Sequence, residues 1–315
     1  GRLGDGTNMD GIGYNSERNT PTQISSLGSG RTAAFSEYND VFHPATGQSS
    51  QVACGQGTYQ PSIGQSSCID TSVGYYSLGT NSIVDLDAGS VQHSCAAYEN
   101  SSLYCWGRND YGQLGDGTTT DSSTPVRVSL PIGRTAVSVS PGNTHSCAVL
   151  DDDSIYCWGE NGYSQLGDGT TTDSYTPVQV NLPSGRTAVS VTTGSYHTCA
   201  ILDDASLHCW GRNNFGQLGD GTTSSSSTPA QVSLPSGRTV ISADAGSQYT
   251  CAILDNALMY CWGYNSQGQL GIGTIFSSST PVQVSLPSGH TVTSISVGHA
   301  LTCAILDDGS MYCWG

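Results

Sequence analysis

Hydrophobic and polar residues alternate along short stretches of this chain with a period of two. In "PVQVNL" the side chains of Val178, Val180 and Leu182 share one face, and in "AVSV" those of Val189 and Val191 do the same. The runs "HTCAIL" and "LHCWG" follow, and turn-rich segments such as "LPSGR", "TTGSY" and "LDDAS" separate the runs. Alternation bounded by Gly, Pro, Ser and Asp is typical of short strands joined by tight turns. The pattern therefore predicts four short strands in this part of the chain and little helix.

This group of four predicted strands recurs along the sequence. The string "GQLGDGTTTD" from Gly112 returns in similar form from Ser164, Gly216 and Gly268. Steps of 52 residues separate five tryptophans, which are Trp106, Trp158, Trp210, Trp262 and Trp314. We divide the chain into the units 1–107, 108–159, 160–211, 212–263 and 264–315. Four antiparallel strands in a repeat of this size predict an all-β fold, a β-propeller whose blades stack on one another.

Composition and charge narrow the functional classes. The chain has 315 residues, 40 of them glycine, and a formal net charge of −16. Its nine basic residues are all arginine, because the sequence contains no lysine. An acidic chain without a basic tract is a poor ligand for nucleic acids or anionic membranes, so we predict neither as a partner. The sequence also lacks an apolar run long enough for a membrane-spanning helix.

The twelve cysteines indicate disulfides and an oxidising compartment. Ten of them form five C-x9-C pairs, which are Cys95/Cys105, Cys147/Cys157, Cys199/Cys209, Cys251/Cys261 and Cys303/Cys313; the other two are Cys54 and Cys68. Zinc sites usually bring cysteines two to four residues apart, which this spacing does not. A hairpin centred on Asp204 would place Cys199 opposite Cys209. We therefore predict one disulfide in each repeat and a secreted or cell-surface location.

Two motifs resemble a known repeat family. The segments "SVTTGSYHTCAIL" (residues 190–202) and "CWGRNNFGQLGDGT" (residues 209–222) are similar to the signatures of the regulator-of-chromosome-condensation repeats. The resemblance implies a propeller, typically of seven blades, and recurs along almost the whole chain. The nuclear founding member of that family is a nucleotide-exchange factor that docks on chromatin with a basic tail. Because this chain has no such tail and carries cysteines at two repeat positions, we expect a disulfide-stapled extracellular version without exchange activity.

The first unit is longer than the others because of an insertion at about residues 36–82. Its segment "ACGQGTYQPSIGQSSCIDTSVGYY" (residues 53–76) is similar to the Cys-rich modules of ephrin receptors and growth-factor receptors. Those modules carry more cysteines, so here a single disulfide between Cys54 and Cys68 is expected. Few apolar residues and one disulfide cannot hold a sizeable core, and we expect the module to pack outside the propeller.

Two repeated polar positions are candidate sites. The carboxylates in "LGDGT", at Asp116, Asp168 and Asp220, are followed by Asp121 and Asp173 in the first two copies and would suit a calcium loop. Ser225 and Ile272 break this pattern in later copies, so the favoured interpretation is an Asp-Gly turn. A second repeated position holds His93, His145 and His197, with Tyr249 and Leu301 in later copies. No partner residues repeat with these histidines, which favours a structural hydrogen bond to a neighbouring strand.

The remaining candidates are aromatic and polar surface residues. The five repeat tryptophans could stack on a ligand, but packing between blades is the simpler role. The sequon "NSS" at Asn100, at the tip of the Cys95–Cys105 hairpin, is a candidate glycan site, with an unoccupied sequon as the equal alternative. The sequence holds no nucleophile motif, P-loop or metal-ligand set. We therefore predict no enzyme, no cofactor and no metal.

Three functional hypotheses remain. The first is an extracellular structural or adhesive protein that builds a filament or surface appendage, and near-identical repeats favour it. The second is a secreted propeller that binds a protein partner through its loops, and the third is a secreted enzyme. The sequence opens on "GRLGDGT" and closes on "YCWG", so its ends are in phase once four residues are restored between them. We expect either a stretch of a longer array or copies that complete each other's blades head to tail.

Overall fold

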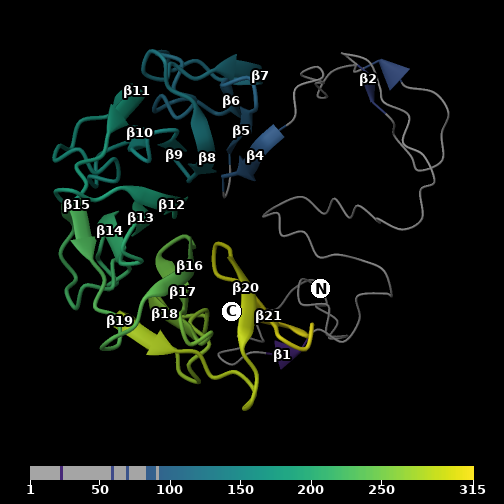
Figure 1. The fold of residues 1–315 in the computed structure, drawn as a ribbon, viewed down its shortest axis with the longest axis vertical. Helices are drawn as coiled ribbons and strands as arrows, with labels where there is room; N and C mark the ends of the chain where they lie inside the picture. Colours follow the sequence, from purple (N-terminus) through teal and green to yellow (C-terminus); the bar gives the residue numbers. More distant parts are fainter. Residues whose placement is uncertain (1–21, 24–57, 60–68, 71–82, 90–91) are drawn as a thin grey trace.

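The computed structural model describes residues 22–23, 58–59, 69–70, 83–89 and 92–315. The described residues form strands and turns and contain no helix, so none of them belongs to a helix that could cross a bilayer. Five four-stranded antiparallel sheets follow one another around an arc (Figure 1). This confirms the predicted all-β propeller architecture.

Each sheet is one blade, and the blades are numbered here in chain order. Blade 1 contains β4 (Ile83–Ala88), β5 (His93–Tyr98), β6 (Leu103–Gly107) and β7 (Ser122–Arg127). Blade 2 contains β8 (Ala136–Pro141), β9 (His145–Leu150), β10 (Ile155–Gly159) and β11 (Ser174–Gln179). Blade 3 contains β12 (Ala188–Thr193), β13 (His197–Leu202), β14 (Leu207–Gly211) and β15 (Ser226–Gln231). Blade 4 contains β16 (Val240–Ala245), β17 (Tyr249–Leu254), β18 (Met259–Gly263) and β19 (Ser278–Gln283). Blade 5 contains β20 (Val292–Val297), β21 (Thr302–Leu306), β22 (Met311–Trp314) and β1 (Thr22–Gln23).

The sequence repeats and the blades are offset by one strand. Unit 160–211, for example, supplies the outermost strand of blade 2 and then the three inner strands of blade 3. Each unit therefore links two neighbouring blades covalently. In blades 1 to 4 the same end carries both the turn after the first strand and the long loop after the third strand, because the strands alternate in direction. We call this end the loop face, and the opposite end the hairpin face.

The outermost strand of blade 5 comes from the beginning of the same chain. β1 pairs antiparallel with β22, with Thr22 opposite Cys313 and Gln23 opposite Tyr312. The equivalent pairs in blade 2 are Val178 with Cys157 and Gln179 with Tyr156, so the register is the same. In the structure the chain therefore completes this blade with its own segment, and not with a segment of a neighbouring copy as hypothesised from the sequence.

The ten blade cysteines form the five expected disulfides. Each lies within one blade, between Cys95 and Cys105, Cys147 and Cys157, Cys199 and Cys209, Cys251 and Cys261, and Cys303 and Cys313. Cys199 is directly opposite Cys209 in the β13–β14 pair, which is the predicted cross-strand geometry. The left-handed hairpin position that suits Gly309 is taken in other blades by Asp153, Ala205 and Ala257, all with positive φ. Alanine and aspartate thus adopt the same left-handed conformation there as glycine.

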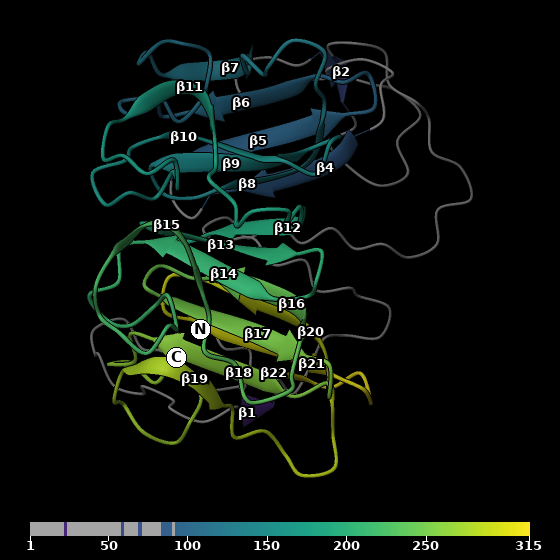
Figure 2. The same cartoon turned by 60° about the vertical axis from the view of Figure 1, so that its left-hand side comes forward.

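The hydrophobic core lies between blades rather than inside one sheet. Leu103 and Leu114 of blade 1 pack with Val139, Leu150 and Trp158 of blade 2, and corresponding clusters join blades 2 to 3, 3 to 4 and 4 to 5. Figure 2 shows the neighbouring sheets stacked face to face. Each sheet buries its alternating apolar side chains against the next sheet, so an isolated blade would expose them.

Little of the inserted segment lies within the described residues. β2 (Thr58–Tyr59) and β3 (Ile69–Asp70) form an antiparallel pair, with Thr58 opposite Asp70. Cys54, Cys68 and the rest of the segment fall outside the described residues. The module and its disulfide stay predictions.

Candidate interaction face

A buried asparagine organises each long loop of the loop face. Asn213 is fully buried, and its Oδ1 accepts a hydrogen bond from the backbone N–H of Leu218 at 2.9 Å. Its Nδ2 donates to the carbonyl oxygens of Thr222 and Ser224. The Oδ1 atoms of Asn109, Asn161 and Asn265 accept the equivalent backbone hydrogen bond in their loops. A single side chain thus supplies hydrogen bonds to several backbone groups of the loop, which would otherwise be left without partners on burial.

The aspartates of "LGDGT" form turns within these loops. Asp116 Oδ1 accepts hydrogen bonds from the backbone N–H and the hydroxyl of Thr118, both at 2.9 Å. Asp121 Oδ1 accepts one from the backbone N–H of Asn109 at 2.7 Å. Gly117, after Asp116, has a φ of 87°, which suits glycine. These contacts agree with the Asp-Gly turn interpretation, because the two carboxylates serve different backbone groups.

A repeated hydrogen-bond network joins each blade to the next. Thr198 Oγ1 and Trp210 Nε1 of blade 3 both donate to the carbonyl oxygen of Gln165 in the blade 2 loop, each at 2.9 Å. The imidazole Nε2 of His145, also in blade 2, lies 2.9 Å from Thr198 Oγ1. Tyr249 replaces histidine in blade 4, and its hydroxyl donates to the carbonyl oxygen of Leu301. The histidines therefore join blades, as the sequence favoured.

Burial keeps these histidines neutral. Loss of hydration lowers the pKa of His93 to about 4, and the pKa values of His145 and His197 to about 3. The neighbouring imidazoles of His197 and His93 lower the pKa of His145 further. Neutral histidines hydrogen-bonded to a hydroxyl of the neighbouring blade are positioned to support the structure.

The repeat tryptophans are packed between blades, with one exception. Trp158, Trp210, Trp262 and Trp314 are fully buried, and each donates Nε1 to the carbonyl oxygen of the loop glutamine in the preceding blade. Trp106 of blade 1, at one end of the arc, is only partly buried. The four buried rings are therefore closed to a ligand. The glycine before each "DG", such as Gly167, lies against the indole of the next blade, where a Cβ would fall within 3.0 Å of the ring.

An aromatic row crosses the loop face at blades 2 to 4. The rings of Tyr163 and Tyr196 meet edge to face, with centroids 5.3 Å apart. The guanidinium carbon of Arg212 lies 4.8 Å from the centroid of Tyr163 and 5.6 Å from that of Tyr196. Phe215 and Tyr264 form a second pair, with centroids 4.6 Å apart. We call these five residues the aromatic row; Tyr163 is 39% exposed, and the other four are partly exposed.

The sequence analysis did not identify this row. Its members stand mainly in the four-residue spacer after Trp-Gly, which reads "RNDY", "ENGY", "RNNF" and "YNSQ" in successive copies. The neighbouring "GQLG" strings are almost invariant, and the similarity of the repeats hid the variation beside them. Aromatic residues and arginine within a variable spacer were the available signal, because those residue types are enriched in protein interfaces.

Carboxylates gather on the innermost strands. Asp244 Oδ2 accepts a hydrogen bond from Val297 N–H of blade 5 at 2.9 Å, and Asp85 Oδ2 accepts one from Val139 N–H of blade 2 at 2.8 Å. Burial raises the pKa of Asp244. Loss of hydration, with added repulsion from Asp244 and Asp85, raises the pKa of Asp87 to about 7. These groups help to join inner strands of adjacent blades.

The network of tryptophan, glutamine, hydroxyl and histidine gives a physical reason for the repeat signature, and the whole sequence matches one family. The sequence profile described as RCC1-like domain matches residues 1–315. This chain belongs to the RCC1-like family. The extent of the match confirms the resemblance to the regulator-of-chromosome-condensation repeats. The inserted Cys-rich module is not covered by this confirmation.

Several characterised proteins are similar to this RCC1-like chain. It is 31% identical over 223 residues to the Ultraviolet-B receptor UVR8 of Arabidopsis thaliana, covering 71% of this chain and 51% of the receptor. It is 30% identical over 224 residues to the E3 ubiquitin-protein ligase HERC2 of Homo sapiens, covering 70% of this chain and 5% of the ligase. The chain thus spans about half of the plant receptor's length and a small part of the ligase.

Solved structures show the same fold. Human WBSCR16 superposes with a TM-score of 0.63 at 20% identity, over 74% of this chain and 57% of that one. Yeast RCC1 (Prp20), solved with Kap60 bound, also gives a TM-score of 0.63, at 23% identity, over 72% of this chain and 54% of that one. At these identities the likeness concerns the fold alone.

Proposed function

We propose that this RCC1-like chain is an extracellular propeller that binds a protein partner through the aromatic row of its loop face. The observation that carries the proposal is the position of Arg212 between Tyr163 and Tyr196, which come from the loops of two neighbouring blades. The Nε atom of Arg212 is buried and has no hydrogen-bond partner among the described residues. Tyrosine, phenylalanine and arginine held rigidly on a partly exposed surface form the usual centre of a protein interface.

The disulfides support the extracellular part of the proposal. All ten blade cysteines are buried at 5% exposure or less and are paired within their blades. Such disulfides form and persist in oxidising compartments. Asn100 is exposed in the β5–β6 turn, on the hairpin face. A glycan at this position would leave the loop face free, and enzymatic deglycosylation of the secreted protein would reveal it as a loss of mass that an Asn100→Gln variant lacks.

The experiment compares two variants against a panel of purified secreted proteins and receptor ectodomains. The triple variant Tyr163→Ala/Arg212→Ala/Phe215→Ala removes the centre of the row. Arg186→Ala is the matched control, because Arg186 is an exposed arginine on the hairpin face, where its guanidinium pairs with Asp204 at 2.9 Å. Binding to each immobilised protein is measured by biolayer interferometry, after circular dichroism has shown that both variants keep their β-sheet signal.

We expect a partner of the wild type to bind the triple variant at least about 30-fold more weakly, as for loss of a single interface hot spot. The Arg186→Ala variant should retain wild-type affinity. A partner that binds the triple variant as tightly as the wild type would place the interface elsewhere and contradict the proposal.

A second candidate is head-to-tail association of copies into a filament. Its support is the outer flank of blade 1, where Ile83 and Leu86 are 51% and 58% exposed and Trp106 is only partly buried. In the other blades the equivalent tryptophan is covered by the preceding blade. Another copy could cover this flank with its own blade 5. Light scattering after gel filtration tests it: a single monomeric mass over a hundredfold range of concentration would reject the filament.

A further inference from the structure

An ion pair recurs on the hairpin face of three successive blades. Arg134 Nη2 lies 2.8 Å from Asp152 Oδ2 in blade 2, and Arg186 Nη2 lies 2.9 Å from Asp204 Oδ2 in blade 3. In blade 4 Arg238 Nη1 lies 3.6 Å from Asp255 Oδ1. In each case the arginine precedes the first strand of the blade and the carboxylate follows its second strand. The hairpin carboxylates of these blades are therefore accompanied by a permanent positive charge.

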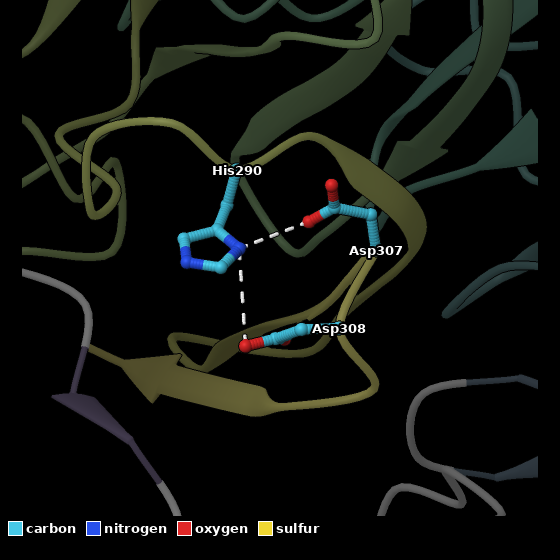
Figure 3. Close-up of side chains that lie close together, drawn as sticks. All are labelled: His290, Asp307 and Asp308. Carbon is cyan, nitrogen blue, oxygen red and sulfur yellow. Dashed lines mark hydrogen bonds and ion pairs between the residues drawn. The ribbon is translucent and has the colours of Figure 1, made fainter.

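Blade 5 keeps two hairpin carboxylates but has no arginine at this position. His290 stands where the other blades carry arginine, and its Nδ1 lies 3.0 Å from Asp307 Oδ1 and 3.8 Å from Asp308 Oδ2 (Figure 3). An imidazole carries a positive charge only when it is protonated, and when neutral it offers a lone pair to a metal ion. In blade 5 the two carboxylates thus face an imidazole that can bind a metal ion, whereas in blades 2 to 4 the hairpin carboxylates face a permanently charged guanidinium.

We propose that His290, Asp307 and Asp308 form a binding site for a divalent transition-metal ion such as Zn²⁺. Their three ligand atoms all lie within 4.8 Å of one another. Around one zinc ion, ligand atoms at about 2.1 Å from the metal stand about 3.4 Å apart. Small rotations of exposed side chains therefore bring nitrogen and both oxygens to bonding distance, and a fourth position stays open to water.

Two independent observations point to a cation at this place. The first is the guanidinium that the other blades hold against the same hairpin position. The second is that local hydrogen bonds orient both carboxylates. Asp307 Oδ1 accepts from Thr291 N–H at 3.3 Å, and Asp308 Oδ1 accepts from Ser310 N–H at 2.9 Å and from Ser310 Oγ at 2.6 Å. Asp308 Oδ2 is left to face the imidazole.

Sequence reasoning predicted no metal site, because the repeats showed no recurring ligand set. This set occurs once among the described residues. Asp307 and Asp308 follow His290 by 17 and 18 positions, so no short motif contains all three. A metal ion here would join the connection between β19 and β20 to the hairpin between β21 and β22. It would replace, by coordination, the ion pair that the other blades use to hold the same two segments together.

The experiment titrates untagged protein with ZnCl₂ in an isothermal calorimeter, after dialysis against a chelating resin. His290→Arg is the main variant, because arginine restores the ion pair of the other blades and so preserves the fold. His299→Ala is the matched control: His299 is exposed and follows β20, whereas His290 precedes it. CaCl₂ is titrated separately, since calcium prefers oxygen ligands to the imidazole nitrogen.

We expect saturable binding of one zinc ion by the wild type and by His299→Ala. The affinity of His290→Arg should fall by more than about tenfold, because loss even of an outer-shell partner costs about 10–100-fold. Three outcomes would each overturn the proposal. The first is equal zinc affinity of His290→Arg and the wild type, and the second is no binding at 1 mM zinc, which is about the weak limit of protein sites for divalent cations. The third is calcium binding with an affinity like that for zinc, which the His290→Arg variant retains.

Discussion

The indole Nε1 of Trp210 donates a hydrogen bond to the carbonyl oxygen of Gln165, 2.9 Å away in the preceding blade. The same oxygen accepts the hydroxyl of Thr198. One backbone carbonyl therefore accepts hydrogen bonds from two side chains of the next blade. This three-residue contact recurs at each junction between described blades, so the tryptophan both packs in the core and forms a hydrogen bond between blades.

Replacing Trp210 by phenylalanine removes the indole donor and part of the buried volume. We expect a loss of about 1–3 kcal/mol in the free energy of unfolding, from the lost hydrogen bond and a small cavity. Urea denaturation followed by circular dichroism measures this loss. Trp106→Phe is the control, because Trp106 is only partly buried. An equal cost for both substitutions would show that the inter-blade contact contributes nothing measurable.

Gly194→Ala tests the close approach of blades at the inner strands. A Cβ at Gly194 would fall within 3.0 Å of both the His197 ring and the carbonyl oxygen of Gly246 in the next blade. Because one of these neighbours is backbone, we expect a loss of at least about 2 kcal/mol or a failure to fold. Gly162→Ala is the control, since only the Glu160 carboxylate comes within 4 Å there. Comparable thermal stability of the two variants would contradict the packing argument.

The buried histidines predict acid lability. His145 and His197 have pKa values lowered from 6.5 to about 3 by burial, so between these limits the unfolded chain binds protons that the folded protein does not. Their contribution to stability is therefore lost as pH falls below about 6.5. Asp87, with a pKa raised from 3.8 to about 7, acts in the opposite direction and is stabilising as pH falls through that window.

A double variant isolates the histidine contribution. His145→Tyr/His197→Tyr copies blade 4, in which the buried Tyr249 donates to the next blade and lies 2.9 Å from Thr302 Oγ1. Asp87 is unchanged in both proteins, so its effect cancels in the comparison. Between pH 7 and pH 4.5 the urea midpoint should fall less in the variant than in the wild type. Parallel decreases would show that the histidines do not determine the acid response.

Peptide mapping without reduction tests all twelve cysteines together. We expect the five blade disulfides and a sixth between Cys54 and Cys68, with no free thiol. Removing one buried pair, Cys199→Ala/Cys209→Ala, should cost about 2–3 kcal/mol, as expected for a short closed loop. A disulfide that joins two blades would contradict the register in which Cys199 faces Cys209.

Local patterns in the sequence predicted the elements well because the relevant partners lie close together along the chain. The period-two runs gave the strands, and the spacing of Cys199 and Cys209 gave their register. The role of Trp210 as packing between blades also followed from its recurrence. In each case the physical cause acts within one repeat or between adjacent repeats, where a regular spacing reveals it.

The features that were not predicted depend on differences between copies or on distant contacts. The pairing of Thr22 with Cys313 joins the two ends of the chain and leaves no periodic signal. Tyr163 and Arg212 come together only because neighbouring loops project from the same face. His290 was not singled out from the sequence, since its two carboxylate neighbours follow on a later hairpin and form no short motif with it.

The pairing of β1 with β22 also sets an order for folding during synthesis. The segment that completes blade 5 leaves the ribosome before its partner strand, which follows about 290 residues later in the sequence. At about 5–20 residues per second, tens of seconds pass between the two events. Throughout that interval β1 cannot pair with β22, and the sheet of blade 5 cannot acquire its outer strand until β22 has been synthesised. Blade 5 is therefore completed only after blades 1 to 4 have been synthesised, and during this interval the nascent chain needs protection from pairing with the strand edges of other chains.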